Sequence, residues 1–107
     1  MSVPSFAVRA DQALEQLIET IESTDGLEDV DLDMVDGVLT MEFEDGARII
    51  VNRQEPLEQL WLATPLGPAH FSFDAASGEW RDARSQEPLY RTLERVFSKQ
   101  LGRLVHF

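Results

Sequence analysis

Carboxylate side chains are the residues of this sequence best suited to chemistry, and they are concentrated in one stretch. Between Ala10 and Ala47 there are thirteen Asp and Glu residues and no Lys, Arg or His, whereas the rest of the chain holds nine basic and seven acidic residues. The formal net charge of −11 therefore arises in this stretch. Its acids are Asp11, Glu15, Glu19, Glu22, Asp25, Glu28, Asp29, Asp31, Asp33, Asp36, Glu42, Glu44 and Asp45.

These carboxylates could bind cations, because oxygen ligands suit hard metal ions. The sequence has neither the loop spacing of an EF-hand nor a set of two His and one carboxylate. Acids spread along an open surface do not form a cage, so we expect weak, poorly selective cation binding at several sites. The same surface could instead receive an Arg/Lys-rich partner by electrostatic steering.

Part of the acidic stretch lies on a predicted helix. Apolar residues recur at helical spacing from Phe6 to Ile21, which indicates a helix that begins at Pro4-Ser5 and ends at Thr24-Asp25-Gly26. One strip of this helix holds Asp11, Glu15, Glu19 and Glu22. Acids near a helix C-terminus cost about 0.3–1 kcal/mol each, and like charges four residues apart about 0.2–0.5 kcal/mol per pair. Such a strip indicates a function; an acidic face that promotes solubility is the alternative.

Period-two alternation follows the helix and predicts strands. Val30, Leu32 and Met34 alternate with Asp29, Asp31 and Asp33, which indicates a strand with one apolar and one acidic face. Acids there could also protect a sheet edge from unwanted pairing. Tight turns predict further strands at residues 38–43, 47–52, 59–64, 69–74 and 80–82. Glu42, Glu44 and Asp45 are interpreted as solvent and turn residues.

A second helix is predicted from Pro88 in its first turn to Gly102, with an apolar tail that should dock on the body. The order of helix, hairpin-linked strands and helix indicates an α+β fold, a two-layer α-β sandwich with an antiparallel sheet. At 107 residues we expect a single domain, residues 1–107.

A second candidate surface lies on the predicted sheet. If Leu60 and Leu62 face the helices, Gln59 and Trp61 face outward, and Trp61 framed by Asn52 and Gln59 makes a flat partner-binding platform. The alternative is a Trp that neighbouring sheet side chains partly cover. His70 and His106 are interpreted as polar surface residues. No nucleophile–base arrangement and no phosphate-binding glycine pattern are present, so we expect no classical enzyme.

Composition limits the cellular location and the classes of partner that we expect. No apolar run is long enough to span a bilayer, and the chain contains no Cys. A sequence pI near 4.4 argues against nucleic acid and anionic membranes as partners, because phosphates would be repelled. We expect an intracellular soluble protein.

The two candidate surfaces lie within motifs that closely resemble the frataxin family in its bacterial form, over nearly the whole chain. The motifs are Gly37-Val38-Leu39-Thr40-Met41-Glu42-Phe43, Asp45-Gly46, Ile50-Val51-Asn52-Arg53-Gln54-Glu55-Pro56, Gln59-Leu60-Trp61-Leu62-Ala63-Thr64 and His70-Phe71, with the early Ala10-Asp11 helix and the C-terminal helix. This resemblance implies two helices packed on one face of an antiparallel sheet.

The resemblance also implies a function. It implies weak, surface-bound iron (Fe²⁺/Fe³⁺), and a regulatory or adaptor role in iron–sulfur cluster assembly with a cysteine desulfurase and its scaffold protein as partners. Carried over by position, the metal-binding ridge is Glu19, Glu22, Asp25, Glu28, Asp29, Asp31 and Asp33, extended by Asp11 and Glu15. The partner-binding sheet surface is Asn52, Gln59 and Trp61.

Two other functions stay open on the sequence alone. One is a metal-independent acidic interaction module. The other is a ferroxidase or iron-storage protein, which ranks last because no converging di-iron Glu/His set is visible. We expect a monomer, with iron-dependent oligomers as an alternative state.

Overall fold

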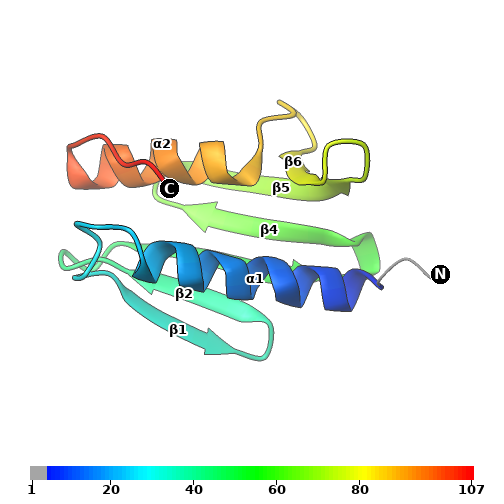
Figure 1. Ribbon diagram of the computed structural model, residues 1–107, viewed down its shortest axis with the longest axis horizontal. Coiled ribbons are helices and arrows are strands. Elements are labelled where there is room, and N and C mark those ends of the chain that lie inside the picture. The colour runs from blue at the N-terminus through cyan, green and yellow to red at the C-terminus, as the bar shows by residue number, and fades with distance from the viewer. Residues whose placement is uncertain (1–4) are drawn as a thin grey trace.

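The computed structural model describes residues 5–107, which form two helices and a six-stranded sheet (Figure 1). The helices are α1 (Phe6–Glu22) and α2 (Leu89–Leu101). The strands are β1 (Asp31–Val35), β2 (Val38–Glu42), β3 (Arg48–Gln54), β4 (Gln59–Thr64), β5 (Gly67–Asp74) and β6 (Glu79–Asp82), with a short 3₁₀ helix at Glu55–Leu57 between β3 and β4.

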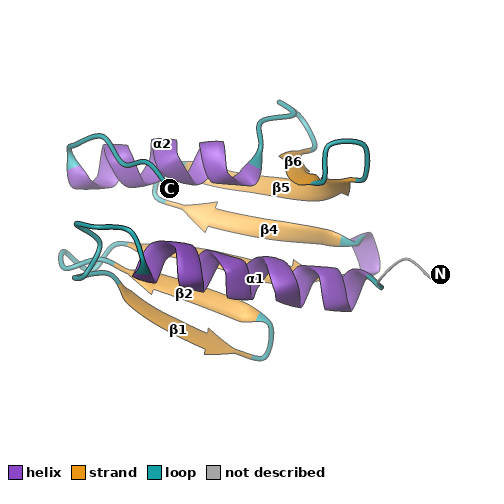
Figure 2. Cartoon of the chain, in the orientation of Figure 1, coloured by secondary structure: helices purple, strands orange, loops and turns teal. Residues whose placement is uncertain are grey.

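The sheet is an antiparallel meander in which the strands lie in chain order from β1 to β6. Both helices lie on the same face of the sheet, α1 towards the β1 side and α2 towards the β6 side (Figure 2). Meander order follows from tight turns: at Asp36-Gly37 both residues have positive φ (49° and 77°), as a two-residue hairpin requires. The predicted α+β two-layer sandwich is confirmed.

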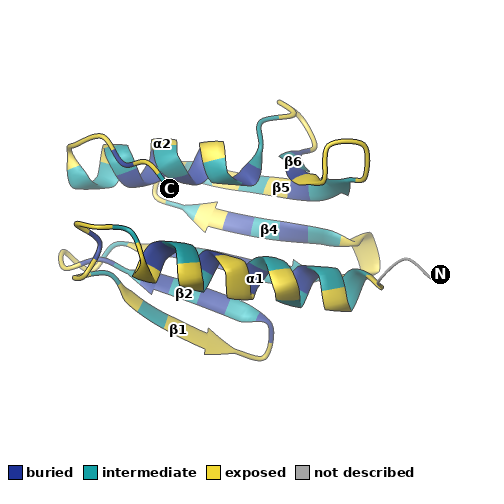
Figure 3. Cartoon of the chain, viewed as in Figure 1, coloured by how far each residue is buried: buried dark blue, intermediate teal, exposed yellow. Residues whose placement is uncertain are grey.

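The core lies between the two helices and the sheet (Figure 3). Alternate strand residues point into it, as a pleated strand requires. The buried strand residues include Leu39, Met41, Ile49, Val51, Leu60, Leu62 and Phe71; the buried helix residues are Ala10, Leu14, Leu17 and Ile21 from α1 and Leu89, Thr92, Leu93, Val96 and Phe97 from α2. The helical spacing read from the sequence thus identifies the core faces of both helices.

Helix α1 begins as predicted but ends differently. Pro4 lies outside the described residues, and Ser5 caps the helix by accepting from the Val8 N–H at 3.3 Å. The predicted ending at Gly26 is wrong, because the helix stops at Glu22 and its cap Ser23 is right-handed. The hydroxyls of Ser23 and Thr24 donate to the carbonyls of residues 19 and 20 at 2.8 and 2.6 Å, so the last turn is satisfied without a glycine cap.

Helix α2 and the tail differ from prediction in small ways. Pro88 precedes α2 as its N-cap and does not lie in its first turn, whereas Gly102 ends it in the left-handed conformation (φ 69°) as predicted. Of the tail, Val105 is buried and Phe107 packs edge-on against Phe97 at 5.3 Å between centroids. Leu104 does not dock: it is 82% exposed.

Several strand bounds also differ. Strand β3 continues to Gln54, two residues beyond the predicted end, because its partner β4 begins opposite that residue. Strand β5 begins at Gly67 and includes Pro68, which a strand tolerates near its end. The predicted apolar face of β1 is only partly covered: Met34 is 38% exposed, since β1 is the edge strand beyond α1 (Figure 1).

Candidate functional site

The acidic strip of α1 lies on the side of the helix that faces away from α2. The opposite side, with Arg9, Ala13 and Gln16, lines a hollow shared with Tyr90 of α2. Residues of the strip fall together because positions three and four apart are neighbours on a helix. They are Asp11, which is half-buried, and Glu15, Glu19 and Glu22, which are exposed. The strip therefore borders the β1 edge of the molecule.

One end of the strip is neutralised by an internal ion pair. The Arg53 guanidinium donates to Asp11 Oδ1 at 2.6 Å and lies 3.3 Å from a Glu55 carboxylate oxygen. Sequence reasoning missed this contact because it ended the strand before Arg53. The pattern that could have indicated this contact is the alternation Ile49, Val51, Arg53, which places Arg53 on the helix side of the sheet. A cation at Asp11 would compete with this guanidinium.

The other end of the strip meets the loop and β1. A hollow of about 350 Å³ is lined by Glu22 from the end of α1, Glu28 from the loop and Asp31 from β1, together with apolar side chains. Leu27, only 3% exposed, anchors the loop to the core. The end of α1, the loop and β1 thus meet at this hollow.

Glu28 is the most constrained acid of this hollow. Its Oε1 accepts from the Gly26 N–H at 3.2 Å, and Arg103 from the C-terminal tail donates to the Gly26 carbonyl. The pKa of Glu28 is lowered, first by hydrogen bonding to its own backbone amide, then by that of Gly26, with Arg103 adding a smaller effect. Glu28 is therefore a carboxylate at neutral pH, and Arg103 is a cation already close to it.

The strand acids lie on the opposite face of the sheet from the helices. Leu32 pairs with buried Met41, whereas Asp31 pairs with Glu42 and Asp33 with Thr40. Directly opposed residues share a face, so Asp31 and Asp33 point away from the helix layer. The acidic ridge, defined as Glu19, Glu22, Asp25, Glu28, Asp29, Asp31 and Asp33, thus wraps around the β1 edge.

Glu42 lies beside the ridge and, unlike a plain solvent residue, has charged neighbours. It is opposite Asp31 on the same face, and like charges in that position repel. Arg48, its partner on β3, lies 3.8 Å from the Glu42 carboxylate and offsets the charge. Glu44 and Asp45 lie in the β2–β3 turn as interpreted.

The described residues do not form a closed metal site. Within residues 5–107, no three His, Asp or Glu side chains come close enough together to hold one ion. The ridge offers separate, exposed carboxylates, which favour weak binding of hard cations over a selective cage.

The outer face of the sheet carries a row of side chains that runs across five strands. The register aligns Val35, Val38, Asn52, Trp61 and His70 on β1 to β5. The neighbouring row holds Asp33 and Thr40. The strand acids and the Trp61 platform are therefore parts of one surface, which sequence reasoning had treated as two.

Trp61 is half-buried, in agreement with the reading of a Trp partly covered by its neighbours. Its ring stacks on His70 with centroids 4.3 Å apart and an angle of 14°, and its Nε1–H donates to Gln59 Oε1 at 2.9 Å. Asn52 Oδ1 is buried beside it and has no hydrogen-bond partner among the described residues. His70 was not selected as a site residue from the sequence. The feature that identifies it is its position on β5, directly opposite Trp61. The stacking and the hydrogen bond fix the orientation of the Trp61 ring.

Comparisons with known proteins agree with this architecture. Residues 1–103 match the model of the frataxin-like domain. The chain is 48% identical over 101 residues to the iron-sulfur cluster assembly protein CyaY of Thioalkalivibrio sulfidiphilus, covering 94% of each chain. The chain therefore belongs to the frataxin-like family, and the resemblance seen in the sequence is confirmed.

Solved structures agree as well. The frataxin of Psychromonas ingrahamii superposes with a TM-score of 0.84 at 37% identity, over 94% of this chain and 92% of that one. The trimeric frataxin of Saccharomyces cerevisiae, complexed with ferrous iron, gives a TM-score of 0.72 at 27% identity, over 96% and 91% of the two chains. Among the described residues, no helix has the length and apolar character needed to cross a membrane.

Proposed function

We propose that this protein acts in iron–sulfur cluster assembly as an iron-binding regulatory adaptor. The observation that carries the proposal is the set of exposed carboxylates that the end of α1, the following loop and β1 bring together around one edge of the fold. The name of its Thioalkalivibrio relative supports the process, and the ferrous complex of the yeast frataxin supports the metal.

Iron is the cargo in this proposal and binds weakly at the surface. The ligands are the ridge acids, with Asp11 and Glu15 as extensions. Separate carboxylates suit weak, multi-site binding of a hard cation. Occupation of Asp11 would displace Arg53, so we place the tighter sites away from that end of the strip.

The partner in this proposal is the cysteine desulfurase with its scaffold protein, in the bacterial cytoplasm. Asp31 and Asp33 share the outer face of the sheet with Asn52 and Trp61. One basic partner surface can therefore contact the strand acids and the Trp61 platform together. The helix acids Glu19 and Glu22 remain outside this face and available to a cation.

The test is a pull-down of desulfurase and scaffold, with and without Fe²⁺, by four variants. Trp61→Arg and Asp31→Lys/Asp33→Lys should lose the partner in both conditions, whereas Glu19→Lys/Glu22→Lys should change mainly the dependence on iron. Glu58→Lys, an exposed acid beside the 3₁₀ helix, is the control and should bind normally. Retention of the partner by Trp61→Arg and by the strand double variant would reject the docking surface.

A metal-independent acidic interaction module is the second candidate. The absence of a three-ligand cluster within residues 5–107 favours it. NMR of the backbone amides during Fe²⁺ titration separates the two: shifts confined to the ridge support the iron-binding adaptor. If the ridge amides are unchanged at millimolar iron while desulfurase binding is intact, the result supports the metal-independent interaction module. We expect the free protein to be a monomer in both cases.

A further inference from the structure

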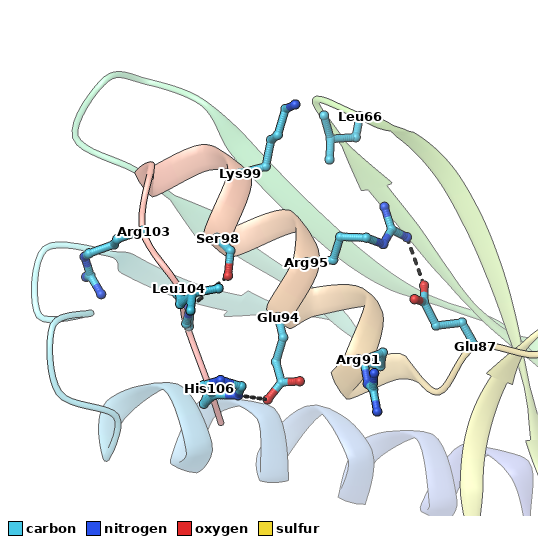
Figure 4. A pocket seen from close by; sticks show the side chains of 11 residues that line it. Leu66, Glu87, Arg91, Glu94, Arg95, Ser98, Lys99, Arg103, Leu104 and His106 are labelled. Carbon is cyan, nitrogen blue, oxygen red and sulfur yellow. Dashed lines mark hydrogen bonds and ion pairs between the residues drawn. The ribbon is translucent and has the colours of Figure 1, made fainter.

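A groove runs along α2 (Figure 4). It encloses about 1090 Å³ and is lined by α2, the C-terminal tail and the β4–β5 turn. Arg91, Arg95 and Lys99 recur along it at intervals of four residues, so they form one stripe on the helix. This groove is the basic counterpart of the acidic strip on α1.

Two of these bases have no acidic partner within residues 5–107. Arg95 pairs with Glu87 at 2.9 Å. Glu94 accepts from the Phe107 N–H at 2.9 Å and lies 3.6 Å from His106 Nδ1. In the described part of the chain, no carboxylate lies within ion-pair distance of Arg91 or Lys99. The groove is therefore a positive surface on a protein whose net charge is −11.

The charge placement lowers the stability of α2. Its first turn holds no acid, and its N-cap Pro88 has no side-chain hydrogen bond to the free amides. Arg91, third in the helix, lies where the dipole disfavours a base. Repulsion between bases at four-residue spacing adds to this cost. Lys99 in the last turn is favoured by the dipole, whereas Arg91 is disfavoured by the dipole and attracted by Glu87, whose pKa it helps to lower.

Two apolar side chains accompany the bases in the groove. Leu66 from the β4–β5 turn is 49% exposed, and Leu104 from the tail is 82% exposed. Figure 4 shows them on either side of the helical stripe. An exposed leucine alone needs no explanation, but leucines flanking unpaired bases make a surface that is both apolar and positive.

We propose that this groove binds an extended acidic segment of a partner protein, in which carboxylates meet Arg91 and Lys99 and apolar side chains contact Leu66 and Leu104. Charge complementarity selects the occupant, since the bases are unpaired and leucines lie beside them. A polyphosphate backbone fits less well, because it has no apolar groups to contact Leu66 and Leu104. Arg91, Arg95 and Lys99 lie on α2 outside the ridge, and the groove approaches the ridge loop at Arg103, which donates to the Gly26 carbonyl.

The test uses a twelve-residue probe peptide in which Glu and Asp alternate with Leu. NMR of the full chain should show amide shifts confined to α2, the tail and the β4–β5 turn. Arg91→Glu/Lys99→Glu should weaken binding about tenfold, as expected for two reversed surface ion pairs. Leu104→Ser should also weaken it. Arg48→Glu/Arg84→Glu makes the same change in net charge outside the groove and should bind normally.

Four outcomes would overturn the proposal. They are no α2 shifts at millimolar peptide, equal loss in the Arg48/Arg84 control, equal binding of a peptide with Gln and Asn in place of the acids, and equal affinity for inorganic polyphosphate. Sedimentation of the protein alone is the remaining check: self-association that Arg91→Glu/Lys99→Glu abolishes would identify the occupant as the acidic ridge of a second copy. Each variant is melted first, so that loss of binding is separated from loss of folding.

Discussion

Replacing the two acids at the end of α1 by Lys should stabilise the protein. Glu19 and Glu22 are exposed, and the last turn of α1 contains no base. Each acid there costs about 0.3–1 kcal/mol against the helix dipole, and a Lys adds a similar attraction. After allowance for solvent screening we expect Glu19→Lys/Glu22→Lys to gain about 1–2 kcal/mol.

Thermal unfolding at low salt, followed by circular dichroism, measures this gain. For a domain of this size about 1 kcal/mol corresponds to roughly 4 °C, so the melting temperature should rise by about 4–8 °C. Glu19→Gln/Glu22→Gln should show about half the rise. Added NaCl should raise the melting temperature of the wild type more than that of the Lys variant, because salt screens the ridge.

The control is Glu44→Lys/Glu58→Lys, which makes the same change in net charge in two turns outside the ridge. An equal rise in the control would mean that net charge alone matters. A Lys variant whose melting temperature is unchanged or lower would refute the reasoning that these acids are placed for function at the expense of stability.

Three further predictions concern contacts that the fold creates. Arg53→Gln should lower the free energy of unfolding by about 1 kcal/mol, because it leaves half-buried Asp11 unpaired; urea denaturation measures it, and no loss would contradict a net contribution from the pair. Gly26→Ala should cost about 1 kcal/mol or more in the same assay, since φ is 90° and a Cβ would lie 2.8 Å from Arg103 Nη2; a neutral result would contradict the positive φ. Asp82, which is 9% exposed, has a pKa lowered below 3.8: burial raises it, but backbone N–H donors and a side-chain hydrogen bond outweigh burial. A lowered folded pKa stabilises the protein above the unfolded value, and this effect is lost as pH falls through the folded value. The deficit of Asp82→Asn should therefore be constant above the ordinary pKa of Asp and shrink as pH falls below it; a constant deficit at all pH values would refute it.

The local parts of the fold could be predicted because neighbouring residues determine them. The 3.6-residue spacing from Phe6 to Ile21 identified the buried side of α1, and Asp36-Gly37 identified a hairpin turn. The end of α1 could not be predicted as well, since hydroxyls of Ser23 and Thr24 replaced the expected glycine cap. Leu104 belongs to the apolar pattern of the tail, but no part of the described structure covers it and it is exposed.

The candidate site also has a part that the sequence predicts and a part that depends on the fold. The concentration of acids and the exposed side of Trp61 could be read from the chain alone, because charge and period-two alternation are local properties. The stacking of Trp61 on His70 and the alignment of Val35, Val38 and Asn52 depend on strand register, and a one-residue shift would send those side chains to the other face.

The sequence by itself determined the charge pattern of this protein: a block of carboxylates on a small α+β domain. Only the tertiary structure decided which carboxylates are free. Arg53 reaches Asp11 across 42 residues and Arg103 reaches the Gly26 carbonyl across 77. It also decided that Asp31 and Asp33 share the outer face with Trp61, whereas Glu19 and Glu22 lie on α1 in the helix layer. Contacts so distant in the chain depend on sheet register and helix packing, which no local pattern encodes.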